Sequence, residues 1–193
     1  MVGTWEVQVT VGGMPEPVAT AFAKLNELVG AEYTPIAYLG SQVVNGTNYA
    51  VLAEQLLMDG KDTKNVVLVI FNQKPGQIGD ASLVSIERVV EQGVGVGGTV
   101  VDVKTEIPAD AKAAFDAAFE GYVGVKVEPF ALLGTQVVKG TDYIFAAEVT
   151  PIVAEPVKYV ALVTVNALTK RVTITDMLAS KQDSLGYAFT WLA

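Results

Sequence analysis

The chemistry open to this chain is limited first by the side chains that it lacks. Its 193 residues include no histidine and no cysteine. Imidazole is the usual general base, a member of the Ser-His-Asp triad and the commonest zinc ligand, and a thiolate is the nucleophile of Cys-His enzymes. Those mechanisms are therefore excluded within the chain, and so are disulfide bonds.

Carboxylates and lysines leave one catalytic hypothesis open. The chain has 21 Asp and Glu residues, and a pair of carboxylates can carry out acid-base chemistry. None of them lies in a recognisable catalytic motif, however, and acidic side chains on a surface are usually just solvated. We therefore expect a protein that is not an enzyme, with no catalytic residue, no metal and no cofactor.

A glycine-rich stretch fits the letters of a phosphate-binding loop. Residues 93–98 read Gly-Val-Gly-Val-Gly-Gly, which matches G-x-G-x-x-G. That motif needs a strand before it and a helix after it, whereas a second β-like run, 99–106, follows here. We interpret the stretch as a flexible linker that leads into a strand.

Charge and hydropathy limit the partners. The net charge is −8 and no basic stripe offsets it, so we expect no nucleic acid and no anionic membrane surface as partner. No apolar run reaches the ~18 residues that suggest a membrane span. The N-terminus lacks the pattern of a secretory signal, which with the absence of cysteine favours the cytoplasm.

An internal repeat organises the chain. Residues 39–49 recur as residues 133–143, with eight of eleven positions identical, and Gly3-Thr4 corresponds to Gly98-Thr99. Repeats of this kind indicate two copies of one structural unit. We predict module one at 1–92, a linker at 93–98 and module two at 99–193.

Each module is predicted to contain one helix among strands. Apolar spacing predicts a helix from Pro17 to about Val29, and alternation predicts strands elsewhere. The expected strands of module one are 4–11, 33–44, 48–58, 65–72 and 83–90. In module two we expect a helix at 109–122 and strands at 99–107, 126–138, 142–153, 158–166 and 172–179. A last aromatic stretch, 187–191, could add a strand or replace the one before it. This layout predicts an α+β fold, with one helix covering an antiparallel sheet.

The repeated segment has the composition of a hairpin tip. Gly46 and Gly140 can adopt a positive φ, which lets the chain reverse between two strands. Val43-Val44 and Val137-Val138 then place apolar bulk near the tip, which suits insertion into an apolar cleft. The alternative is an ordinary β-hairpin with valines in its strands.

These tips carry a resemblance to a known family. Gln42-Val43-Val44-Asn45-Gly46 and Gln136-Val137-Val138-Lys139-Gly140 resemble the Q-x-V-x-G motif of cystatins, the reversible inhibitors of papain-like cysteine proteases. The sequence of residues 46–49 is similar to the stefin branch. The resemblance implies tandem cystatin-like modules, each an antiparallel sheet of four to five strands wrapped around one α-helix.

Cystatins use two further protease-binding elements, a trunk glycine and a second hairpin. Thr10-Val11-Gly12-Gly13 is similar to the trunk, although it could equally be a turn between strand and helix. Lys74-Pro75 lies where stefins have Leu-Pro, so Pro75 matches and Lys74 departs. Module two has no glycine at 105–108 and no proline at 167–170.

The resemblance implies an inhibitor that occludes the protease cleft with the trunk and two hairpin loops, mainly through module one. We expect a monomer or a dimer formed by domain swapping. The alternative is a non-inhibitory binding or assembly module, because the paired domains of latexin do not use the hairpin edge.

Overall fold

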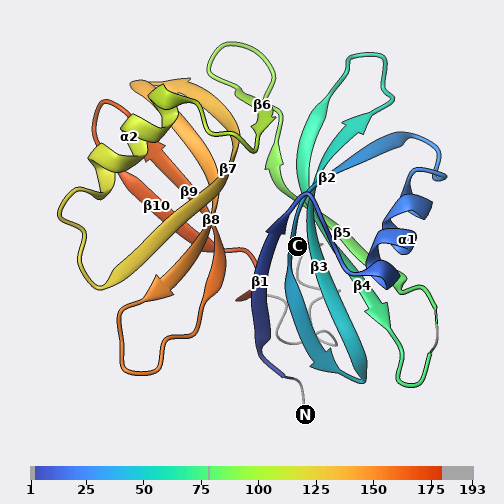
Figure 1. The fold of residues 1–193 in the computed structure, drawn as a ribbon. Coiled ribbons are helices and arrows are strands. Elements are labelled where there is room, and N and C mark those ends of the chain that lie inside the picture. The colour runs from blue at the N-terminus through green and yellow to red at the C-terminus, as the bar shows by residue number, and fades with distance from the viewer. Residues whose placement is uncertain (1–2, 78, 180–193) are drawn as a thin grey trace, which may run out of the picture.

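The computed structural model describes residues 3–77 and 79–179 as two five-stranded antiparallel sheets with a helix beside each (Figure 1). The strand orders are β1-β2-β3-β4-β5 and β10-β9-β8-β7-β6. The first repeat contains β1 (Trp5–Val11), α1 (Glu16–Leu25), β2 (Ala31–Val44), β3 (Gly46–Leu57), β4 (Lys64–Gln73) and β5 (Ser82–Glu91). The second contains β6 (Thr99–Lys104), α2 (Ala109–Phe119), β7 (Val125–Val138), β8 (Gly140–Pro151), β9 (Tyr159–Asn166) and β10 (Val172–Asp176). The aromatic stretch 187–191 lies outside the described residues.

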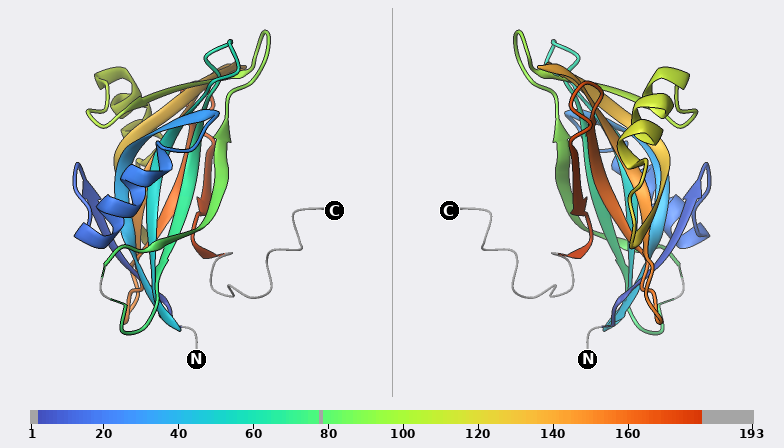
Figure 2. Two further views of the ribbon diagram at one scale, coloured as in Figure 1. Left: turned by 90° about the vertical axis from the view of Figure 1, so that its right-hand side faces the viewer. Right: turned by 90° about the vertical axis from the view of Figure 1, so that its left-hand side faces the viewer.

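The fold class expected from the sequence is wrong. Among the described residues, ten strands outweigh two helices of 10 and 11 residues, so the chain is mostly β rather than α+β. Nor does each sheet wrap around its helix as the cystatin-like arrangement requires. The two sheets pack against each other, and α1 and α2 lie on the outer faces, onto which the two views of Figure 2 look in turn.

The physical reason is that each sheet is apolar on both faces. In β4, residues 66–71 are all buried. Val66, Leu68 and Ile70 face the core between the sheets, and the alternate residues Val67, Val69 and Phe71 face the core under α1. A ten-residue helix is about 15 Å long and covers only part of one face. Burial of the second face requires another apolar layer, which the other sheet supplies.

Three cores result. The central one draws on both repeats, with Leu39 of β2 and Leu133 of β7 fully buried. Phe22 of α1 and Phe115 of α2 anchor the two outer cores. Because the central core is shared, the division of the chain into modules that fold separately stays a prediction.

The two repeats point in opposite directions. Strand β5 begins opposite Asn72, near the β2–β3 turn, and ends opposite Asn65 at the far end of the sheet. Residues 93–98 then lead to the β7–β8 turn, where the Gln136 side chain donates to the Gly97 carbonyl. Ten residues of strand extend about 33 Å. The two hairpin turns therefore lie at opposite ends of the sandwich.

Candidate functional site

Three chain segments meet at each end of the sandwich. We define end one as Gly3, 43–46 and 74–76, and end two as 93–98, 137–140 and 167–170. Each contains one copy of the repeated hairpin tip. The expected contact residues 42–46 and 74–75 thus lie together, and 136–140 lie at the other end.

Gly46 fixes the tip of end one. Its φ is 105°, and a Cβ atom there would lie 2.2 Å from the carbonyl oxygen of Gln73. The hairpin is paired as far as Val44↔Gly46, so Asn45 alone forms the turn. Because the two backbones approach this closely, only glycine fits, and the first hairpin is held directly against the end of β4.

Gln42 is a positioning residue. Its side chain is fully buried, so it is not available to a partner in this structure. Its amide donates to the Gly3 carbonyl at 3.0 Å, while its oxygen accepts from the Asn48 amide at 3.2 Å. Asn72 in turn donates to Asn48 at 2.8 Å. This chain of amides ties the N-terminal segment, the hairpin and β4 together.

The backbone adds a second tie between the same segments. The Gly3 N–H donates to the Val43 carbonyl at 2.8 Å. Gly3 therefore lies directly beside the hairpin tip. The sequence analysis did not predict Gly3 as a site residue. The match of Gly3-Thr4 with Gly98-Thr99 in the internal repeat was the signal that could have indicated it.

The second loop of end one is braced from below. The Gln73 side chain accepts from the Tyr49 hydroxyl and donates to the Gly79 carbonyl. The carboxylate of Asp80, further along the same loop, binds Lys24 of α1, and this contact raises the pKa of the Lys24 ammonium. The loop that carries Lys74 and Pro75 is therefore anchored to both the sheet and the helix.

The surface that end one presents is small and apolar at its centre. Val43 is 62% exposed and Val44 is half-buried. Asn45, Lys74 and Pro75 are exposed around them. These side chains come from loops held by Gln42 and Gln73, so they form an ordered edge.

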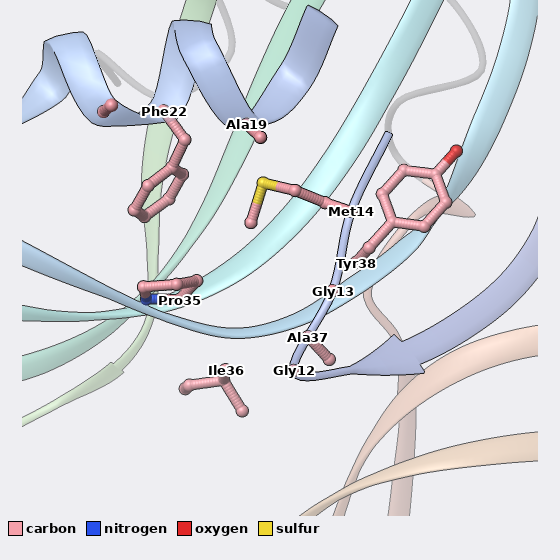
Figure 3. Close-up of a pocket in the computed structure, with 10 residues that line it drawn as sticks. Gly12, Gly13, Met14, Ala19, Phe22, Pro35, Ile36, Ala37 and Tyr38 are labelled. Atoms are coloured by element: carbon pink, nitrogen blue, oxygen red, sulfur yellow. The ribbon is translucent and has the colours of Figure 1, made fainter. Parts of the chain in front are cut away.

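Gly12 and Gly13 lie elsewhere. They follow β1, and Val11 pairs with Ala37, seven residues along β2 from Val44 and thus about 20 Å from the tip. The two glycines line an apolar pocket of about 390 Å³ between α1 and β2, together with Met14 and Phe22 (Figure 3). The structure therefore does not bring Gly12, Gly13 or the adjacent trunk residues to end one.

Tyr38 closes this pocket on the side away from Phe22 (Figure 3). Burial raises the pKa of its hydroxyl. Like an ordinary tyrosine, it is neutral at physiological pH, and none of the other described residues that line the pocket is titratable.

End two is held by different contacts. Gly140 has a φ of 94°, and a Cβ there would lie 2.7 Å from Cβ of Leu168. Asp142 takes the place of Asn48; its carboxylate accepts from Asn166 at 2.6 Å and from Arg171 at 3.3 Å. A charged network thus replaces the neutral amides of end one.

The surface of end two is more apolar than that of end one. Val94 and Val96 of the glycine-rich loop are fully exposed, Val137 is 69% exposed and Leu168 is 64% exposed. Val138 and Lys139 are exposed as well, while Gln136 is half-buried.

The glycine-rich loop closes on itself, because the Gly93 N–H donates to the Thr99 carbonyl at 2.8 Å.

The described residues contain no group of three or more His, Cys, Asp or Glu side chains placed to hold a metal ion. None of the helices in that part of the chain is long and apolar enough to cross a membrane. No protein-family model matches the chain, and no curated protein matches it.

Proposed function

We propose that the protein is a reversible inhibitor of papain-like cysteine proteases and that end one is the edge that enters the active-site cleft. The observation that carries this proposal is the meeting of Gly3, the 43–46 turn and the 74–76 loop on one edge, held by the buried Gln42. The Q-x-V-x-G motif lies at the centre of that edge.

The mechanism is occlusion. Val43 projects from a hairpin whose backbone is paired up to the turn, so little conformational entropy is lost when it enters an apolar subsite. Pro75 restricts the second loop in the same way. Inhibitors of this kind bury about 1,600 Å² in total with their protease. No catalytic residue, metal or cofactor takes part.

The N-terminal contact of this edge differs from the sequence-based expectation. Gly3, rather than Gly12 or Gly13, lies beside Val43. The proposal therefore assigns the trunk position to the residues around Gly3 and leaves the pocket at Gly12 out of the inhibitory edge.

The test is a titration of active papain and of cathepsins B and L with the purified protein. We expect Val43→Asp to weaken inhibition by about 100-fold or more, because it places a carboxylate in an apolar cleft. Val29→Asp is the matched control, since Val29 is fully exposed and follows α1, far from end one. Equal inhibition by the two variants would show that end one is not the inhibitory edge.

A second candidate function rests on end two. Its five exposed aliphatic side chains come from three adjoining loops: Val94, Val96, Val137, Val138 and Leu168. Such a patch suits a protein partner rather than solvent. Under this alternative the protein is a non-inhibitory binding or assembly module. Binding to a protease that leaves its peptidase activity unchanged, and that Val137→Asp abolishes, would support it.

A further inference from the structure

We call the junction between the two sheets, on the side of β1 and β10, the seam. Strands β1 and β10 are edge strands, each paired on one side only among the described residues. Where β1 approaches the start of β9, a pocket of about 230 Å³ lies between the sheets. Trp5 and Val7 of β1 line one wall, and Tyr159, Asp176 and Leu178 line the other.

Trp5, which lines this pocket, carries an unsatisfied donor. Trp5 is only 7% exposed, and its indole Nε1 is buried without a hydrogen-bond partner in residues 3–77 and 79–179. Buried indole N–H groups normally find an acceptor. An extended chain in this pocket would bring apolar side chains to its lining and a backbone carbonyl close to Trp5.

The strand beside the pocket is short. Strand β10 has five residues, whereas its counterpart β5 has ten. The last backbone bond to β9 is donated by Met177 to the Val160 carbonyl. Residues 177–179 lie outside β10, and within the described residues the outer edges of β1 and β10 pair with no other strand.

The chain itself continues from this place. Ala179, which ends the described part of the sequence, lines the pocket, and residues 180–193 follow. Leu185, Tyr187, Phe189 and Trp191 alternate with Gly186, Ala188 and Thr190. This period of two is the pattern of a strand with one apolar face. Residues 180–183 are polar and leave enough chain for a reversal.

We propose that residues 184–192 dock as a β-strand in the seam between β1 and β10, with their aromatic face in the pocket and a backbone carbonyl accepting from the Trp5 indole. Nine residues span about 30 Å, enough to run along the seven-residue β1. The docked strand joins the two sheets along this seam. Because Trp5 pairs with Gln42, the docked strand also stabilises the N-terminal side of end one.

Spin labelling of the full chain tests the position of the segment. The protein has no cysteine, so Thr190→Cys gives a single nitroxide site. We expect the label to broaden the NMR signals of the Trp5 indole, Val7 and Asp176, and to leave those of α1 and α2 unchanged. Broadening elsewhere, or none, would overturn the proposal. A mixture of isotope-labelled chain without the cysteine and spin-labelled unenriched chain gives broadening only if a second copy fills the seam, which would overturn it too.

A second measurement uses Trp5 itself. In a Trp191→Phe background Trp5 is the only tryptophan. We expect Tyr187→Ser with Phe189→Ser to shift Trp5 emission to the red and to speed exchange of its indole proton at least tenfold. Ala188→Ser with Thr190→Ser, on the opposite face of the segment, is the matched control and leaves both unchanged. Equal exchange rates in the two double variants would contradict the proposal.

Discussion

End one and end two share a repeated hairpin but are held in different ways. At end one, backbone packs on backbone at Gly46, and the neutral amides of Gln42 and Asn48 join the three segments. At end two, Gly140 faces a side chain, and the carboxylate of Asp142 replaces Asn48. The comparison shows that a repeated motif preserves the turn, while the contacts behind it determine how firmly that turn is held.

The largest expected difference is at the two hairpin glycines. Gly46→Ala places a methyl group against the rigid Gln73 carbonyl, so we expect a loss of about 3–5 kcal/mol in the free energy of unfolding. Gly140→Ala meets the Leu168 side chain at a turn that can shift, and we expect a loss of about 2–3 kcal/mol. Urea unfolding measures both.

Gly60→Ala separates strain from contact in that experiment. Gly60 has a φ of 73°, with nothing within 4 Å of the added Cβ. Gly60→Ala should therefore lower the free energy of unfolding only by the cost of the positive φ, about 1–2 kcal/mol. If Gly46→Ala costs no more than Gly60→Ala, the close approach of the hairpin to β4 is not present in solution.

The second difference is at the two glutamines. Gln42→Ala leaves the Gly3 carbonyl and the Asn48 amide without their partner in a buried site, which costs about 2–3 kcal/mol. Gln136 is half-buried and its side chain donates to the Gly97 carbonyl, so Gln136→Ala should cost about 1 kcal/mol. The free energy of unfolding in urea is again the readout. Equal losses would mean that the two ends are held alike.

The smallest difference concerns the charge at end two. Asp142→Asn keeps an acceptor for Asn166 but removes the ion pair with the largely exposed Arg171, so we expect a loss of about 0.5–1 kcal/mol. That loss should shrink in 1 M salt, because screening already weakens the pair. If 1 M salt leaves the loss in the free energy of unfolding unchanged, Asp142 stabilises end two through packing rather than through its charge.

Sequence patterns predicted the local elements well. Alternation and turn residues placed ten strands, and the predicted end of the strand at Val44 matches β2. The first helix was expected to reach Val29 but ends at Leu25. Asn26 stops it, because its side chain accepts from the Tyr33 N–H and donates to the Tyr33 carbonyl, a contact that spacing does not show.

The arrangement of these elements was harder to predict. Residues 66–71 are continuously apolar, which signals a strand buried on both faces, but they do not reveal what covers the second face. The trunk was placed at Gly12 because a double glycine preceded the helix. The register of β1 with β2 instead puts Gly3 beside Val43, and register is a tertiary property.

The most direct test of end one as the inhibitory edge is an active-site titration of papain with the intact protein, Val43→Asp and Val137→Asp. The account predicts that one chain inactivates one papain, that Val43→Asp loses this activity, and that Val137→Asp keeps it. Loss of inhibition with Val137→Asp alone would contradict the account and place the inhibitory edge at end two.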